Sequence, residues 1–276
     1  MRVQMLGLCR FSHLGAPAFQ QEHATLQERR AFLYDPARLA RRWFWFENVA
    51  LPGLLAQTDP DFTLVVMTGP DLPQPYLDDL RELTRLVPQL RLELVGPRDT
   101  HLQACMAAIR PHVDPAADVV GHFRHDDDDA ISTDYIAAAR ADFRFARPLF
   151  RQAGRVSVDY CRGFVLRADG TGVRARPQVI HNASAALTIY LQPDVDRCAI
   201  HFPHWQLALS MPGLVLADQP RFVRVLHHDN DSGAIGAGYP WMLPQDQVSE
   251  MLANRFRLHL PTIDQGVRRF GEPPAG

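Results

Sequence analysis

The sequence predicts an α/β fold in which a mainly parallel, doubly wound sheet is flanked by helices, with a smaller antiparallel extension in the second half. Segments typical of strands and of helices alternate through the first 150 residues. Hydrophobic residues make up 46% of the 276 residues, enough for a sizeable core. We expect a single domain over residues 1–276, with a ligand-binding lobe at 1–150 and a second lobe at 151–276.

The strands of the first half are predicted from short apolar runs that end at turn or polar residues. These runs are Val3–Arg10, Phe62–Met67, Leu90–Val95 and Val119–Phe123. Parallel strands need long, usually helical connections, and such sheets bind ligands beyond the carboxyl ends of their strands. We therefore expect a candidate crevice where these runs end.

Helices are predicted between these strands from capping residues and apolar spacing. Asp35 is a good N-cap and Pro36 suits the first turn, so one helix begins there. Further along it, we expect Arg41 and Arg42 to lie on a solvated face. Three more helices are predicted, at residues 75–86, 100–109 and 132 to about 145.

The second half changes character, because its apolar runs are short and carry fewer helix signals. Asp169 and Gly170 favour a hairpin turn between two of these runs. The segments that we expect to be extended are 155–162, 163–167, 173–176, 185–191 and 222–226. They form the predicted antiparallel extension.

The composition argues against several classes of protein. The 29 basic residues, none of them a lysine, nearly balance 31 acidic ones, so nothing indicates a nucleic-acid partner. No apolar run approaches the ~18 residues of a membrane span, which leaves only peripheral membrane contact open. The N-terminus carries no cleavage pattern, so we expect a cytoplasmic protein. The cysteines are widely spaced, as is typical of buried thiols in a reducing compartment: Cys9, Cys105, Cys161 and Cys198.

The most informative residues are four consecutive aspartates, Asp126–Asp129, directly after a predicted strand. Four ionised carboxylates repel one another unless a cation or basic groups offset their charge. In an extended chain, Asp126 and Asp128 would share one face, with Asp127 and Asp129 on the other. Mg²⁺ and Mn²⁺ prefer carboxylate and phosphate oxygens, so the run predicts a divalent cation that also binds a phosphorylated substrate.

These residues and several short blocks resemble a bacterial rhamnosyltransferase family with the GT-A fold. The resemblance covers residues 1–145 and depends most on an Arg-x-Asp-Asp-Asp-Asp run at 124–129. The other matching blocks are residues 10–12, 51–52, 57–59, 61–62 and 134–136. The resemblance implies a GT-A-like, Rossmann-like fold and a glycosyltransferase that depends on Mn²⁺ or Mg²⁺. Such an enzyme would transfer a sugar, rhamnose in the family's name, from a nucleotide-sugar donor to a glycan or other hydroxyl acceptor, with inversion.

The resemblance also implies roles for particular side chains. Asp126, Asp128 and Asp129 are the expected metal ligands, and Asp126 is also expected to contact the donor. Enzymes of this fold often add a histidine from the C-terminal part, and His227 and His228 follow a predicted strand. Strand alternation favours His228 as the inward-facing residue, with an exposed histidine pair as the alternative.

Donor-binding residues are expected where the first and fourth strands end. Arg10, Ser12 and His13 lie at the end of the first strand, and Arg124 precedes the aspartates. An arginine fork suits the diphosphate of a nucleotide sugar, because it can donate two parallel hydrogen bonds to phosphate oxygens.

An inverting transferase needs a general base for the acceptor hydroxyl. The acidic motif that many GT-A enzymes use is missing from residues 194–210. The candidates there are His204, Asp196 and His201, and His204 is favoured because the adjacent Trp205 suits the apolar face of a sugar. The missing acidic base leaves one alternative open, a non-catalytic protein that binds a nucleotide sugar or a carbohydrate.

Zinc and calcium sites fit the sequence less well. The pairs His122 with His125 and His201 with His204 each lack a nearby third zinc ligand. The acidic run lacks the ligand spacing and the glycine of an EF-hand loop.

Overall fold

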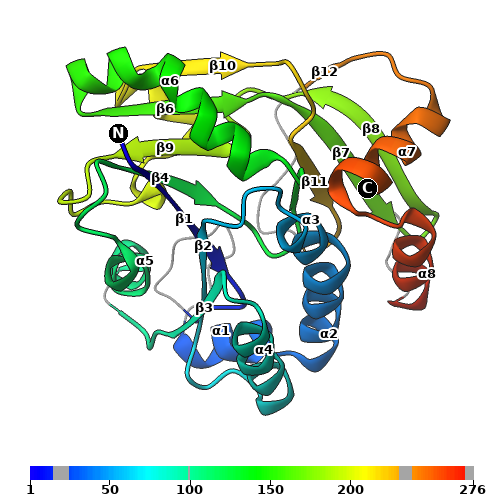
Figure 1. The fold of residues 1–276 in the computed structure, drawn as a ribbon. Helices are drawn as coiled ribbons and strands as arrows, with labels where there is room; N and C mark the ends of the chain where they lie inside the picture. Colours follow the sequence, from blue (N-terminus) through cyan, green and yellow to red (C-terminus); the bar gives the residue numbers. More distant parts are fainter. Residues whose placement is uncertain (15–24, 99, 230–237, 271–276) are drawn as a thin grey trace.

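The computed structural model describes residues 1–14, 25–98, 100–229 and 238–270, and its framework is two sheets (Figure 1). The larger sheet contains β1 (Val3–Arg10), β2 (Thr63–Thr68), β3 (Leu90–Leu94), β4 (Val119–Arg124), β6 (Arg155–Tyr160), β9 (Leu187–Leu191) and β10 (Gly213–Leu216). Its strand order is β10-β6-β9-β4-β1-β2-β3, and every strand in that order except β9 runs in the same direction. The predicted mainly parallel sheet is therefore confirmed.

The smaller sheet combines strands from both halves of the chain. It contains β5 (Ala130–Ile131), β7 (Arg162–Asp169), β8 (Gly172–Val179), β11 (Phe222–Leu226) and β12 (Tyr239–Pro240). Their order is β12-β8-β7-β11-β5, and the pairs are antiparallel apart from β7 with β11. The turn predicted at Asp169 and Gly170 joins β7 to β8, so an antiparallel extension is confirmed. Two of the segments assigned to it are placed wrongly, however, because β6 and β9 pair within the larger sheet.

Helices cover both faces of the larger sheet. The helices are α1 (Leu26–Leu33), α2 (Pro36–Trp45), α3 (Leu51–Leu55), α4 (Gln74–Leu86), α5 (His101–Ile109), α6 (Tyr135–Ala153), α7 (Gln245–Phe256) and α8 (Leu260–Phe270). Met5 and Cys9 of β1 pack in one core cluster with α2, α3, α4 and α6, whereas Leu6 and Leu8 pack with α5. Alternate residues of β1 thus contact helices on opposite faces, as expected for a doubly wound sheet. The last two helices, α7 and α8, pack against the smaller sheet.

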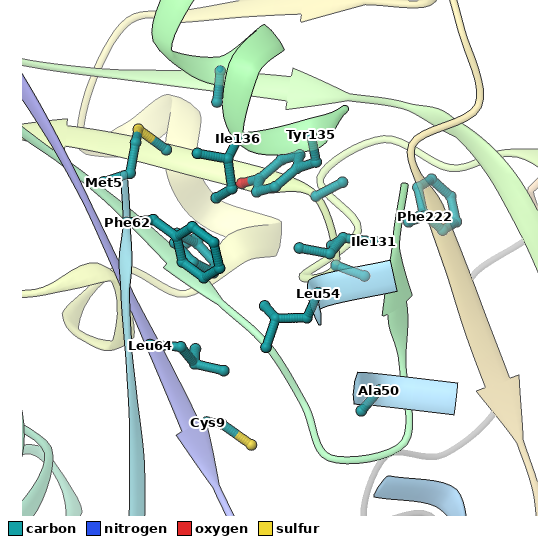
Figure 2. Packing of buried hydrophobic residues seen from close by; sticks show 14 of the residues in the cluster. Met5, Cys9, Ala50, Leu54, Phe62, Leu64, Ile131, Tyr135, Ile136 and Phe222 are labelled. Atoms are coloured by element: carbon teal, nitrogen blue, oxygen red, sulfur yellow. The ribbon is translucent and has the colours of Figure 1, made fainter. Parts of the chain in front are cut away.

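The main core anchors both ends of the segment that carries the aspartates. Figure 2 shows Met5 and Leu64 of the larger sheet in one buried cluster with Tyr135 and Ile136 at the start of α6. Phe123 of β4, before the acidic run, and Ile131 of β5, after it, belong to the same buried cluster. The residues before and after the acidic run are therefore held in the core, which fixes the position of the run between them.

Two helices in the second half, α7 and α8, differ from the expectation of few helices there. The buried residues of α7 are Val248, Leu252 and Phe256, one narrow apolar stripe in a mostly polar segment. Such a stripe is a weak helix signal until the smaller sheet is present to cover it. α1, which the sequence pattern also does not predict, buries only Arg29.

α6 begins later and ends later than predicted. It begins at Tyr135, because Ser132 donates its hydroxyl to Asp134 at 2.6 Å and does not cap the helix. It continues past residue 145 to Ala153, with Pro148 inside it on the exposed side. Buried apolar residues recur on its inner face beyond the predicted end, so tertiary packing outweighs the unfavourable proline.

The structure bears on two expectations drawn from the composition, one about membrane-spanning segments and one about cysteine burial. No helix in the described part of the chain is both long and apolar enough to cross a membrane. The four cysteines are buried and unpaired, as predicted.

Gly53 allows α3 to lie directly against β5. A side chain there would clash with the backbone carbonyl oxygen of Ile131, which cannot move without disturbing the strand. We expect G53A to lower the free energy of unfolding by about 1–3 kcal/mol, the usual cost of overpacking. Urea denaturation measures this loss. The control is G96A, since nothing lies within 4 Å of a Cβ at Gly96; equal losses in both variants would contradict the predicted clash.

Candidate active site

The candidate site lies at the carboxyl edge of the larger sheet. β1 and β4 are parallel neighbours, so Arg10 and Arg124, their last residues, lie at the same edge. Asp126–Asp129 follow within the turn that joins β4 to β5. Sheets of this kind bind ligands at such an edge.

The four aspartates form a turn and not an extended segment. The Asp129 N–H donates to the Asp126 carbonyl oxygen at 3.2 Å. As a result, Asp127 and Asp128 both contact Arg42, although alternation predicts that they face opposite ways. The predicted alternation along this run is therefore wrong, because it assumes an extended backbone.

Arg42 of α2 neutralises two of the carboxylates. Its Nε donates to Asp127 Oδ2 at 3.1 Å, and its Nη1 donates to Asp128 Oδ2 at 2.9 Å. The side chains of Arg42, Asp127 and Asp128 are buried, so water screens these contacts little. Burial alone would raise the pKa of Asp128, but Arg42 and a hydrogen bond from His227 outweigh it and hold that pKa well below its usual range.

Asp126 is the carboxylate most open to a ligand. Its side chain is 28% exposed, whereas those of Asp127 and Asp128 are 2% and 8% exposed. Its Oδ1 lies 3.3 Å from Arg10 Nη2 and 3.7 Å from Arg124 Nη2. Partial burial would raise the pKa of Asp126, but Arg124 and Arg10 lower it overall. Asp126 therefore presents an ionised carboxylate between two guanidinium groups.

Asp129 is the carboxyl group that the basic residues neutralise least. Its Oδ1 accepts a hydrogen bond from the Val225 N–H at 3.0 Å. Burial and the neighbouring Asp128 carboxylate raise the pKa of Asp129 well above its usual range. A raised pKa favours the protonated, neutral form of Asp129, so this carboxyl group would have to release its proton before its oxygens could bind Mg²⁺ or Mn²⁺. Within the described residues, no three His, Cys, Asp or Glu side chains are grouped to hold an ion by themselves, so phosphate and water would have to complete the coordination.

The inward-facing histidine is His227, not the predicted His228. His227 is fully buried, its Nε2 lies 3.0 Å from Asp128 Oδ2, and its ring stacks on Trp45 with centroids 5.2 Å apart. His228 is 32% exposed and lies 3.3 Å from Asp229. Alternation could not decide between the two histidines, because β11 is covered on both faces and its apolar residues do not mark an outer side.

His204 is held in a state suited to accepting a proton. It begins a 3₁₀ helix (His204–Leu209), and its Nδ1 lies 2.7 Å from the Asn182 carbonyl oxygen. A carbonyl oxygen only accepts, so Nδ1 carries the proton and Nε2 carries the lone pair. Burial and then Arg124 lower the pKa of His204, and Asp126 also influences it, which places His204 in the electrostatic reach of the acidic turn. Trp205, 70% exposed, lies beside it with ring centroids 4.9 Å apart.

Asp196, the other predicted base, lies on the surface. Its side chain is 89% exposed, and its carboxylate is 3.7 Å from Arg110. His201 is turned back on its own segment, with Nδ1 3.2 Å from the Cys198 backbone nitrogen. Of the candidate bases, His204 is therefore the one with support from its surroundings, because Arg124 and Asp126 both influence its pKa.

Of the three candidate residues at the end of β1, Arg10 contacts the acidic turn. Ser12 and His13 instead form hydrogen bonds that hold the segment after β1 in place. Arg10 bridges Asp126 and His101, whose Nε2 lies 3.1 Å from Arg10 Nη1. Ser12 accepts a hydrogen bond from Arg38 at 3.4 Å. His13 lies 2.9 Å from the Val95 carbonyl oxygen, and burial lowers its pKa.

Sequence reasoning missed Arg42 and His101. A signal for Arg42 was present, because buried Leu39 and Phe46 are three and four residues away and share its helix face. The expectation of a solvated Arg42 is therefore wrong. His101 opens α5 and gives no comparable signal; burial and the nearby Arg10 lower its pKa to about 3, so it is a neutral partner for that guanidinium.

Comparison with known proteins identifies a family. The family model described as "Putative rhamnosyl transferase" matches residues 4–239. No curated protein matches the chain.

Solved structures are similar to this chain only at low identity. TarS 1–349 from S. aureus is 11% identical with a TM-score of 0.38, and the match covers 80% of this chain and 60% of that one. The same protein in complex with UDP is 13% identical with a TM-score of 0.38, covering 82% of this chain and 61% of that one. The chain thus spans about three fifths of these TarS structures.

Removing Arg42 should strongly destabilise the protein. In R42M two buried carboxylates lose their shared counter-ion, and breaking such a pair costs about 3–5 kcal/mol. Chemical denaturation at pH 7 gives the change in free energy of unfolding. The matched control is R81A, since Arg81 and Asp78 form an exposed pair with side chains 49% and 57% exposed, and such pairs contribute about 1 kcal/mol or less. Similar losses in R42M and R81A would show that Arg42 is not a structural counter-ion.

Proposed function

The chain belongs to the family described as "Putative rhamnosyl transferase", and on that premise we propose a metal-dependent, inverting glycosyltransferase. It would transfer a sugar, rhamnose in the family's name, from a nucleotide-sugar donor to a hydroxyl of a glycan acceptor. The observation that carries the proposal is an ionised Asp126 between two guanidinium groups at one sheet edge, together with a neutral His204 whose pKa Arg124 and Asp126 influence.

The donor diphosphate would bind at Arg10, Arg124 and Asp126. Guanidinium forks bind phosphate oxygens through paired charge-assisted hydrogen bonds, and both arginines lie within 4 Å of Asp126. Asp126, the most open carboxylate, would hold Mn²⁺ or Mg²⁺ together with the diphosphate, with Asp128 and Asp129 behind it. When bound, that ion supplies Lewis-acid stabilisation of the departing diphosphate.

His204 would act as the general base. Its Nε2 would take the proton of the acceptor hydroxyl as the oxygen attacks the anomeric carbon. The new glycosidic bond forms while the bond between that carbon and the diphosphate oxygen breaks, and the nucleoside diphosphate departs with the electron pair. Attack opposite to the leaving group inverts the anomeric centre. The low pKa of His204 keeps it neutral at pH 7 and ready to accept this proton.

The acceptor would lie against Trp205. Its indole is 70% exposed and adjoins the proposed base, so it offers a flat apolar surface where the acceptor hydroxyl must be presented. A pyranose ring has an apolar face that suits such a surface, which favours a glycan over a small polar acceptor. Nucleotide sugars are made in the cytoplasm, which is where we propose that the protein acts.

Metal-dependent donor binding tests the first part of this proposal. Calorimetric titration with a panel of nucleoside diphosphates should detect binding that Mn²⁺ or Mg²⁺ strengthens and EDTA weakens. We expect D126N to bind the preferred nucleotide at least 10-fold more weakly with Mn²⁺ present, because it loses the exposed charged ligand. The control is D61N, since Asp61 is 89% exposed and pairs with Arg140 away from the site. Equal affinity with Mn²⁺ and with EDTA would refute the metal-dependent proposal.

Loss of His204 tests the second part. We expect H204Q to lower kcat by about 10²–10⁴-fold, the usual contribution of a general base, whereas D196A changes it little because Asp196 lies on the surface. Base catalysis needs neutral imidazole, so wild-type kcat should fall with decreasing pH only below about 6.5, the ordinary histidine pKa. Nucleotide binding without turnover in the wild type would instead indicate the non-catalytic alternative.

A further inference from the structure

We infer that Asp159 is a positioning residue that orients His204 through the backbone of Asn182. This inference deepens the proposed function and depends on His204 being the base. Asp159 was not among the residues that the sequence pattern indicated, and nothing in the acidic turn contacts it directly.

The link consists of two hydrogen bonds across one residue. Asp159 Oδ2 accepts from the Asn182 N–H at 2.8 Å, and the Asn182 carbonyl oxygen accepts from His204 Nδ1–H at 2.7 Å. The carboxylate thus fixes the residue whose carbonyl selects the tautomer of the imidazole. With Nδ1 committed to that carbonyl, Nε2 is left as the proton acceptor.

Asn182 needs such support because of its backbone conformation. Its φ is +53°, in the left-handed region that few residues other than glycine adopt, although asparagine tolerates it better than most. The conformation turns the N–H of Asn182 toward Asp159 and its carbonyl toward His204. Without the carboxylate, the segment would lose the contact that holds this arrangement.

The Asp159 carboxyl group is buried, and only one of its oxygens accepts a hydrogen bond. The residue is 2% exposed, and its Oδ1 is buried without a hydrogen-bond partner. Two titratable side chains lie near it: His181, 3.6 Å from Oδ2, and Cys161, whose pKa is raised by burial and then by the Asp159 charge. Burial raises the pKa of Asp159 to about 6, so its charge is unfavourable in the folded protein near neutral pH. A group held at such a cost to stability is typical of a functional position.

The position of Asp159 in the sheet supports the same role. It is the penultimate residue of β6, which runs in the same direction as β1 and β4. The carboxyl ends of these three strands therefore lie at the same edge. Asp159 therefore lies near the same edge of the sheet as Arg10 and Arg124, which flank Asp126. It is linked to His204 through Asn182.

The test combines a tautomer measurement with a double-mutant cycle. Nitrogen-15 NMR of histidine-labelled protein reports which ring nitrogen carries the proton, and comparison with H204Q assigns the His204 signals. We expect the Nδ1–H tautomer in the wild type and a mixture in D159A. D159N retains an acceptor oxygen and should keep the wild-type tautomer, which also covers the case in which D159A folds poorly.

Turnover is measured with whichever nucleotide sugar of the panel is active. We expect D159A to lower kcat about 10-fold, with the donor KM unchanged within twofold, because a residue that orients a functional histidine through a hydrogen bond typically contributes about 10–100-fold. In the H204Q background, D159A should cause no further loss, since Asp159 acts only through His204. The control is D142A, which removes the acceptor for the Tyr160 hydroxyl at 3.1 Å but has no link to His204.

Two results would overturn the inference: an unchanged tautomer in D159A, or equal losses from D159A with and without His204. The failure of the proposed function looks different. If H204Q retains full turnover while D159A still shifts the tautomer, Asp159 positions His204 but His204 is not the base.

Discussion

Four carboxylates and the guanidinium groups that oppose them have to be accommodated together at one edge of a buried sheet. Arg42 brings α2 to Asp127 and Asp128, and His227 brings the end of β11 to the same Asp128. A helix, a turn between the two sheets and a strand of the smaller sheet therefore meet through a few charged contacts. Because all 29 lysine-or-arginine positions are arginines, none of the guanidinium counter-ions loses its proton near neutral pH.

The sheet architecture followed from the sequence because its signals are local. Apolar runs ending at polar residues placed β1, β2, β3, β4 and β11 within one or two residues, and a cap of aspartate and proline placed α2. Two of the helices that the sequence pattern does not predict, α7 and α8, are stabilised by packing against the smaller sheet. α7 packs Val248 and Leu252 on the smaller sheet, a surface that does not exist until strands from both halves have paired. A helix that is stabilised mainly by such tertiary packing cannot be predicted from its own segment of sequence.

The sequence predicts where the site lies, but not which side chains contact one another within it. Residue type and strand ends indicate the aspartate run and Arg10, which do lie at the predicted edge, whereas His204 is indicated by the adjacent Trp205. The partners that determine their charge are not indicated, because Arg42 and His227 are distant in sequence and approach only in three dimensions. Asp159 is the extreme case, since its link to His204 passes through a backbone conformation that no side-chain pattern encodes.

The stacked contact between Trp45 and His227 gives the protein an intrinsic optical reporter. Trp45 is 1% exposed, and its indole lies almost parallel to the imidazole, at 13°, while that imidazole contacts Asp128. A ligand that displaces the Asp128 carboxylate would disturb this stack and so alter the fluorescence of a tryptophan that the ligand does not touch. The state of the site can thus be followed in solution without a label.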